Sequence, residues 1–123
     1  MIESNVIKAA SLKELPFTLD SAILSNSTFV GRASGHSMQG VGIFDGDLLV
    51  IDRAIKPKQN EIIVAVFNGV YVCKLIDLKN NNLVSASDDY PPVNITKHDS
   101  FTLEGVVTQS IRLHKTPVGL SNE

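Results

Sequence analysis

The Asn68-Gly69 pair is the feature that most constrains how this chain can fold, because it separates two apolar runs, Glu61–Phe67 and Val70–Leu75. A two-residue type I′ turn needs positive φ at both central positions, and Asn followed by Gly adopts those angles at low cost. The pair therefore predicts a tight hairpin between two antiparallel strands, and places at least part of the chain in a β-sheet.

The rest of the chain consists mainly of further short β-rich runs broken by turn residues. These runs are Ser27–Ala33, Leu48–Asp52, Leu83–Ser85 and Phe101–Leu113, the last with Gly105 as a bulge. Turn or loop composition marks the segments between them, at Asp45–Asp47, Asn80–Asn82 and Ser87–Pro92. The pattern predicts a mostly β domain with little helix.

The hairpin register gives Lys74 an unusual position. Counting outward from the turn, Phe67 faces Val70 and Ile63 faces Lys74. Both faces of this strand are apolar, so the lysine points toward apolar surroundings on either face. Burial disfavours the charged ammonium, and a buried neutral lysine can act as a general base. The alternative is that its stem lies along the sheet while the ammonium reaches water.

Ser37 is the hydroxyl that could use such a base. It lies in the segment Ser34-Gly35-His36-Ser37-Met38, where Gly35 permits an unusual backbone angle. A serine hydroxyl is a poor nucleophile until a neighbouring base takes its proton, and Ser-Lys pairs do this in some hydrolases. Ser37 is also one of twelve serines, and spacing alone does not distinguish it from serines in turns and on the surface.

Composition excludes several classes of function. The chain has 123 residues, about the size of one domain, with 43% hydrophobic and 20% charged residues. A net charge of −2 gives no electrostatic footprint for direct duplex binding. Cys73 is the single cysteine, which excludes an intramolecular disulfide and a Cys-rich zinc site. The apolar runs are too short to span a membrane.

Three motifs together resemble the LexA/UmuD family of Ser-Lys peptidases. They are the serine motif Ser34–Met38, the acidic turn and strand Asp45–Asp52, and the lysine strand Val72–Leu75. The similarity extends from about Thr28 to Val107 and is strongest to phage- or plasmid-borne UmuD′ homologues, which lack a cleavable N-terminal arm. The resemblance implies a compact domain of several twisted antiparallel sheets, without cofactor or metal.

The same resemblance implies roles for individual residues. Ser37 would be the nucleophile and Lys74 the general base, with the backbone N–H groups of His36 and Ser37 as oxyanion donors and Met38 packed beneath the nucleophile. UmuD proteins commonly have an acidic residue where this chain has His36, whose position beside Ser37 makes it a poor candidate for the base.

Other chemistry-bearing residues have simpler interpretations. Asp45 and Asp47 flank Gly46 and are expected to form a turn rather than a metal pair. His98 and His114 are expected on the surface. Cys73 is expected to be a buried core thiol.

The expected function is that of a UmuD′-like accessory subunit of an error-prone translesion DNA polymerase in SOS mutagenesis after DNA damage. We expect a cytoplasmic homodimer in a bacterial host cell that binds a UmuC-type polymerase subunit, with a RecA filament and intact UmuD as further partners and no direct sequence-specific DNA binding. The alternative is an active serine peptidase that cleaves a UmuD- or LexA-like protein in trans. A signal-peptidase-like enzyme shares Ser-Lys chemistry but requires a membrane anchor.

The expected organisation is a mobile N-terminal arm at 1–26, a peptidase domain at 27–116 and a loose tail at 117–123. Within the arm, Met1–Leu15 carries a weak helical pattern without clear caps. No Ala-Gly or Cys-Gly bond precedes Ser37, so self-processing is not expected to be needed.

Overall fold

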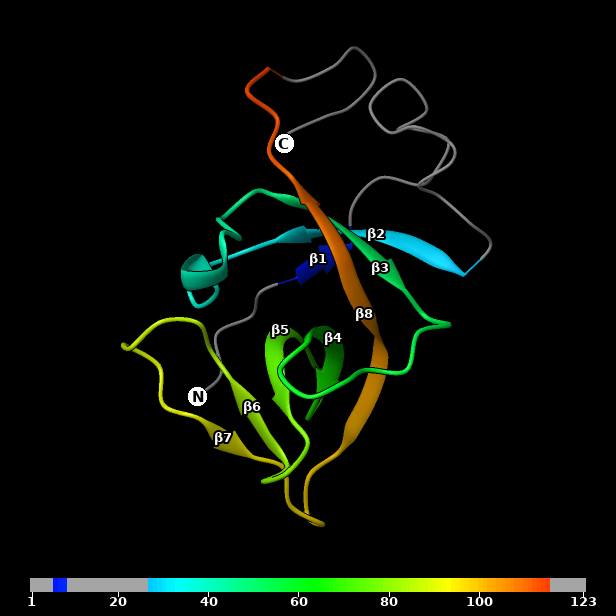
Figure 1. The fold of residues 1–123 in the computed structure, drawn as a ribbon, viewed down its shortest axis with the longest axis vertical. Helices are drawn as coiled ribbons and strands as arrows, with labels where there is room; N and C mark the ends of the chain where they lie inside the picture. The colour runs from blue at the N-terminus through cyan, green and yellow to red at the C-terminus, as the bar shows by residue number, and fades with distance from the viewer. Residues whose placement is uncertain (1–5, 9–26, 116–123) are drawn as a thin grey trace.

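The computed structural model of the protein describes residues 6–8 and 27–115. Within these residues, eight strands form one antiparallel sheet in the order β1-β2-β3-β8-β4-β5-β6-β7 (Figure 1). The strands are β1 (Val6–Lys8), β2 (Thr28–Ala33), β3 (Leu48–Asp52), β4 (Ile62–Phe67), β5 (Val70–Asp77), β6 (Asn82–Val84), β7 (Val93–Asn94) and β8 (Phe101–Ile111). The mostly β fold class is confirmed, although the strands are hydrogen-bonded into one continuous sheet where we expected several.

The β4–β5 hairpin has the predicted turn and register. Asn68 has φ 50° and Gly69 has φ 83°, both in the left-handed region that a type I′ turn requires. Phe67 pairs with Val70 and Ile63 pairs with Lys74. The turn therefore determines which residues of β5 share a face with Lys74.

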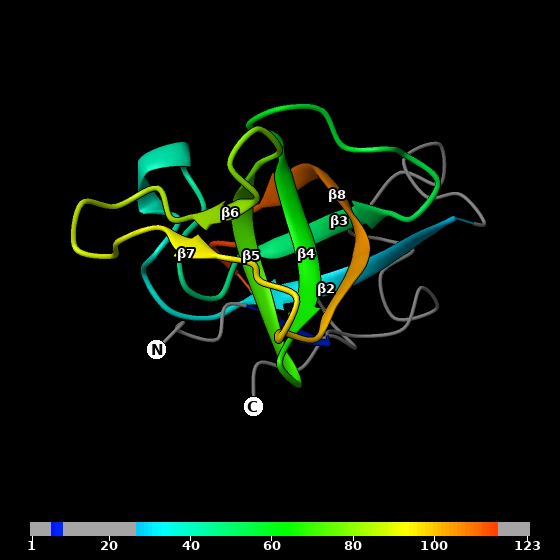
Figure 2. The same ribbon diagram turned by 90° about the horizontal axis from the view of Figure 1, so that it is seen from below.

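The long strand β8 joins the two halves of the sheet. Its first half pairs with β4 and its second half pairs with β3. The register shifts once in each half, so that Glu104 and Thr108 have no opposite residue on the neighbouring strand. The first shift leaves Glu104 unpaired, one residue before Gly105, where we expected the bulge. Bulges bend a strand and increase its twist, and in Figures 1 and 2 β8 runs along the molecule while β4 and β5 cross the direction of β2 and β3.

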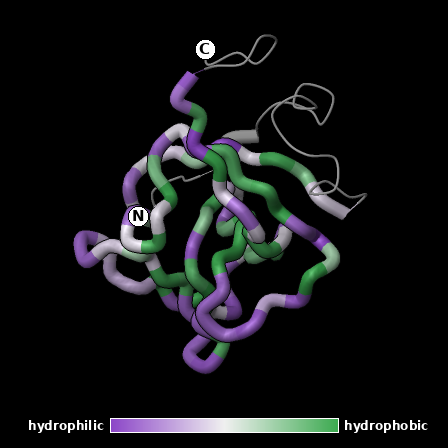
Figure 3. The backbone as a smooth tube through the Cα atoms, turned by 45° about the horizontal axis from the view of Figure 1, so that its top comes forward, coloured by the Kyte–Doolittle hydropathy of each residue, from purple (hydrophilic) through white to green (hydrophobic). Residues whose placement is uncertain are grey.

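Two groups of buried side chains pack on the sheet. The first group is Ala33, Met38, Ile43, Leu49, Ile51, Val64 and Cys73. The second group is Ile63, Ala65, Phe67, Val72, Ile76, Leu83 and Val106. Consecutive residues of β5 belong to different groups, as the alternation of side chains along a strand requires. Hydrophobic residues accordingly concentrate in the strands and hydrophilic residues in the connecting loops (Figure 3).

β1 differs from the sequence prediction. Val6–Lys8 pairs antiparallel with Gly31–Ala33 of β2, where we expected a helical turn or a mobile arm. The outer edge of β2 offers unpaired backbone groups, and pairing with them outweighs a weak helical pattern that has no caps. The remainder of the predicted arm and the predicted tail at 117–123 lie outside the described residues.

The other strand predictions hold within two residues. β5 continues to Asp77, beyond the predicted end at Leu75, and β8 ends at Ile111, before the predicted end at Leu113. The predicted loop Ser87–Pro92 contains no strand.

No helix in the described part of the chain has the length and apolarity needed to cross a membrane.

Candidate active site

Ser37 and Lys74 meet inside the protein. The Lys74 Nζ lies 2.9 Å from the Ser37 Oγ, although 37 positions separate the two residues in the chain. Ser37 is 0% exposed and Lys74 is 2% exposed, so the contact is withdrawn from water. The alternative in which the ammonium reaches solvent is therefore wrong.

Lys74 is held in this position by its strand. β5 has β4 on one side and β6 on the other, and its neighbours Val72 and Cys73 are both buried, in different core groups. The aliphatic stem of Lys74 lies among these apolar residues. Its amine, at the end of the stem, contacts polar groups. Burial of this kind favours the neutral amine over the ammonium.

Ser37 lies on the loop that leaves β2. Gly35 has φ 90°, a backbone angle that a side chain would strain, and it turns the chain just before the serine. The Gly35 N–H donates to the Asp45 carboxylate at 2.9 Å. Met38 follows the serine and is buried in the first core group, as expected. The loop then forms a short 3₁₀ turn, η2 (Gln39–Val41).

Asp47 and Arg112 fix the far end of this loop. The Asp47 carboxylate accepts from the Phe44 N–H at 2.9 Å and from Arg112 Nε and Nη2 at 2.9 and 3.0 Å. Arg112 also donates to the Gly42 carbonyl at 3.2 Å and lies 4.2 Å from the centre of the Phe44 ring. The hydrogen bond to Asp47 raises the pKa of Arg112 further above its usual range. Asp45 and Asp47 thus organise the loop, as the turn interpretation predicted.

Ser85 is a site residue that the sequence analysis missed. Its Oγ lies 2.9 Å from the Lys74 Nζ, so the amine contacts two hydroxyl groups. The next residue, Ala86, donates its N–H to the Ser37 carbonyl at 2.8 Å and accepts from the Gly40 N–H at 2.7 Å. The segment Ser85–Ala86 therefore contacts both members of the Ser-Lys pair. The contact depends on the register of the short strand β6, which has no clear signature in the sequence.

Tyr90 and Cys73 also lie near the lysine. The centre of the Tyr90 ring lies 5.6 Å from the Lys74 Nζ, within the range of a cation–π contact. Burial raises the pKa of the Cys73 thiol to about 12, against a smaller opposing effect of Lys74. A thiol in this environment stays neutral near pH 7, so Cys73 is a core residue, as expected.

The three histidines have exposed side chains, whereas Ser37 and Lys74 are buried. His36 is exposed, and its Nδ1 lies 3.1 Å from the Gln39 amide nitrogen. His98 and His114 are exposed as predicted. The group that contacts the Ser37 Oγ at 2.9 Å is the Lys74 amine.

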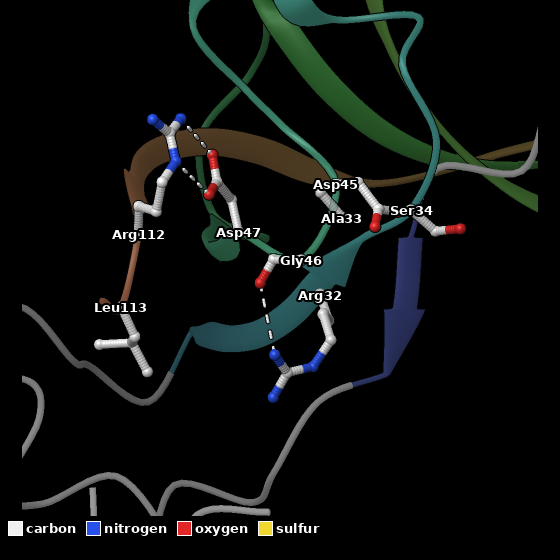
Figure 4. A pocket seen from close by; sticks show the side chains of 8 residues that line it. All are labelled: Arg32, Ala33, Ser34, Asp45, Gly46, Asp47, Arg112 and Leu113. Atoms are coloured by element: carbon white, nitrogen blue, oxygen red, sulfur yellow. Dashed lines mark hydrogen bonds and ion pairs between the residues drawn. The ribbon is translucent and has the colours of Figure 1, made fainter. Parts of the chain in front are cut away.

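A cavity of about 410 Å³ opens beside the same loop and is drawn in Figure 4. It is lined by Arg32, Ala33, Ser34, Asp45, Gly46, Asp47, Arg112 and Leu113. Neither Ser37 nor Lys74 belongs to this lining, so the cavity adjoins the loop rather than the Ser-Lys pair. Arg32 donates to the Gly46 carbonyl at 3.3 Å and helps to close the turn.

In residues 6–8 and 27–115 no three His, Cys, Asp or Glu residues are grouped as metal ligands.

An antiparallel β domain with a buried serine and lysine in hydrogen-bond contact has the arrangement of a Ser-Lys peptidase. A protein-family model described as Peptidase S24-like matches residues 4–108. The chain belongs to this family, the LexA/UmuD family, as the sequence motifs predicted.

Individual relatives agree with this assignment. Protein ImpA of Salmonella typhimurium is 34% identical over 110 residues, which are 88% of this chain and 74% of ImpA. Protein SamA of Salmonella typhimurium is 38% identical over 91 residues, 73% of this chain and 61% of SamA. The LexA repressor of Syntrophotalea carbinolica is 30% identical over 112 residues, 89% of this chain and 54% of the repressor. The chain thus spans about half of the repressor and about three quarters of ImpA.

Proposed function

We propose that this protein is a UmuD-like Ser-Lys peptidase that cleaves a peptide bond in a UmuD- or LexA-like protein. The 2.9 Å contact between Lys74 Nζ and Ser37 Oγ, in a site withdrawn from water, carries the proposal. The geometry is suited to proton transfer, which needs donor and acceptor within about 2.6–3.2 Å.

In the first half of the reaction, the neutral Lys74 amine takes the Ser37 Oγ–H proton while Oγ attacks the scissile carbonyl carbon. The backbone N–H groups of His36 and Ser37 stabilise the negative charge that develops on the carbonyl oxygen. The C–N bond then breaks, and the Lys74 ammonium returns its proton to the leaving amine. The products are a free amine and an ester on Ser37.

In the second half, a water molecule attacks the ester carbonyl. Lys74 takes a proton from this water, and the tetrahedral intermediate collapses with release of Ser37 Oγ, which recovers a proton from the ammonium. The new C-terminus leaves as a carboxylate. Since only the neutral amine can act as base, the rate rises with pH until Lys74 is fully deprotonated.

The test uses ImpA or a LexA repressor whose own catalytic serine has been replaced, so that any cleavage occurs in trans. We expect the wild-type protein to cleave this substrate faster at pH 9–10 than at pH 7. Ser37→Ala and Lys74→Ala should each abolish cleavage, while the exposed lysine variant Lys56→Ala should cleave at the wild-type rate. If the protein cleaves no relative that carries a cleavable N-terminal arm, even at pH 9–10, the proposal is wrong.

A second function is compatible with the first: a UmuD′-like accessory subunit of an error-prone translesion polymerase in SOS mutagenesis. The similarity to ImpA over 88% of this chain, together with the UmuD′-like motifs, favours it. The protein would act as a homodimer bound to a UmuC-type subunit, with a RecA filament and intact UmuD as further partners. A net charge of −2 fits a protein that reaches DNA through its partners.

This second function predicts co-purification with a UmuC-type polymerase subunit from damaged cells and restoration of damage-induced mutagenesis in cells that lack UmuD. Ser37→Ala should retain both properties, because neither needs hydrolysis. Wild-type protein that fails in both assays would overturn the accessory role and leave the peptidase proposal untouched.

A further inference from the structure

The segment Ser85–Ala86 contacts both members of the Ser-Lys pair. We infer that Ser85 is a positioning residue that orients the Lys74 amine toward Ser37, an inference that rests on the proposed role of the pair. Ser85 acts through Lys74 and does not itself touch the reacting bond.

The register of β6 explains why Ser85 reaches the lysine. Leu75 pairs with Val84 and Ile76 pairs with Leu83. Ser85 directly follows β6, and continuing the register by one position places it opposite Lys74. Residues that face each other across antiparallel strands point to the same side of the sheet. This placement accounts for the 2.9 Å distance between the Ser85 Oγ and the Lys74 Nζ.

The neutral Lys74 amine has enough N–H groups and lone pairs to form hydrogen bonds with both Ser85 and Ser37. A neutral lysine carries two N–H donors and one lone pair, and the lone pair must face the Ser37 hydroxyl proton for catalysis. One N–H donated to Ser85 limits rotation about the Cε–Nζ bond. With Nζ 2.9 Å from both hydroxyl oxygens, the lone pair can then accept from Ser37 while Ser85 accepts from the amine.

The backbone of Ala86, next to Ser85, forms a hydrogen bond with Ser37. Ala86 donates its N–H to the Ser37 carbonyl at 2.8 Å, and its own carbonyl accepts from the Gly40 N–H at 2.7 Å. A Cβ at residue 40 would collide with the Ala86 carbonyl oxygen, so the glycine permits this close approach. The segment Ser85–Ala86 thus contacts Lys74 through a side chain and Ser37 through the backbone.

The groups that face the lysine decide how a Ser85 variant alters its titration. Ser85 and Ser37 are neutral hydroxyls, Cys73 next to it on β5 holds a neutral thiol, and the Tyr90 ring lies 5.6 Å from Nζ. Loss of the Ser85 hydroxyl therefore changes hydrogen bonding without removing a charge. The ammonium loses more than the amine because hydrogen bonds from charged donors are stronger.

Titration of the Lys74 ¹³Cε chemical shift tests the inference without a substrate. In Ser85→Ala the midpoint should fall by roughly half to one pH unit relative to wild type. Ser85→Thr keeps a hydroxyl and should return the midpoint toward the wild-type value. The matched control is Ser87→Ala, whose hydroxyl accepts from the Asp89 N–H at 3.4 Å in the following loop, and it should not shift the midpoint.

The direction of the shift separates positioning from loosening of the structure. A variant that merely admits water around Lys74 would raise the midpoint toward the ordinary lysine value, because water stabilises the ammonium. An unchanged or raised midpoint in Ser85→Ala, or a threonine variant that behaves like alanine, would overturn the inference.

Cleavage kinetics supply the second readout. The high-pH plateau of kcat should fall roughly 10- to 100-fold in Ser85→Ala, as expected for a misplaced catalytic group, and the low-pH limb should move to lower pH. A wild-type plateau in this variant would also overturn the inference. If the wild-type protein cleaves no substrate, the peptidase proposal fails, whereas the titration still decides whether Ser85 holds Lys74.

Discussion

Arg112, directly after β8, donates two hydrogen bonds to the carboxylate of Asp47, at 2.9 and 3.0 Å, although 65 positions separate the two residues in the chain. Asp47 is 2% exposed, so its charge depends on this partner and on the Phe44 N–H for compensation. The pair joins the end of the longest strand to the loop that carries Ser37. The geometry of the loop that carries Ser37 is therefore coupled to the end of β8.

Asp47→Asn tests this coupling. The amide keeps the shape of the side chain but loses the charge that matches Arg112, and we expect the free energy of unfolding to fall by about 1–3 kcal/mol. Urea denaturation of the variant and of the exposed control Asp88→Asn checks the value. Equal stability of the two variants would show that the ion pair does not hold the loop.

Gly40→Ala should disturb the site from the opposite side. A Cβ at this position collides with the Ala86 carbonyl oxygen, so the loop and the segment Ser85–Ala86 must separate. We expect a loss of about 1–3 kcal/mol in stability, as for other overpacked positions, and a greater loss of cleavage than the stability change alone explains. Gln39→Ala, at an exposed neighbouring position, is the control and should change neither.

Part of this site could be predicted from sequence, because local chemistry determines it. Asn68-Gly69 imposes a type I′ turn, and the turn alone places Lys74 opposite Ile63 with apolar residues on either side. Gly35 and the Asp45–Asp47 turn have similarly local signatures. The identification of Ser37 as the partner of Lys74 came from three motifs taken together and from no single local pattern.

The role of Ser85 could not be predicted in the same way. Its contact with Lys74 depends on the length of the β5–β6 turn, which sets the register. Three consecutive asparagines, Asn80–Asn82, lead from this turn into β6, and they are compatible with several turn types. β1 was missed for a related reason, since its strand conformation depends on the unpaired edge of β2, which the local sequence does not encode. The single continuous sheet likewise depends on how β8 bends at its bulges.

Asn68 offers a test of the hairpin turn with a matched control. Its side chain donates to Asp99 at 3.0 Å and accepts from the Ser100 N–H at 2.8 Å, while its backbone has φ 50°. Asn68→Gly keeps the backbone angle and loses the side-chain bonds, which should cost about 1 kcal/mol. Asn68→Ala also strains the backbone and should cost about 1 kcal/mol more.

Thermal or urea unfolding of the two Asn68 variants separates the two contributions. Equal stabilities would mean that the turn tolerates alanine without backbone strain, and would contradict the assignment of the turn as the element that sets the register.

Cys73 should make the protein less stable in alkaline solution. Burial raises the pKa of its thiol in the folded protein to about 12, from an ordinary value of 9.0. Between these two values the unfolded chain has lost the thiol proton while the folded protein keeps it. Stability is therefore complete below about pH 9 and falls as the pH rises toward 12, by about 1.4 kcal/mol for each pH unit.

Urea unfolding of wild type and Cys73→Ala at pH 8.0, 9.0, 10.0 and 10.5 measures this effect. The alanine variant leaves a small cavity and should be less stable at pH 8.0, but its stability should fall less steeply above pH 9, since it has no thiol to titrate. Other groups that titrate in this range are common to both proteins and cancel in the difference between them. Parallel stability curves for the two proteins would show that the thiol ionises as readily in the folded protein as in the unfolded chain.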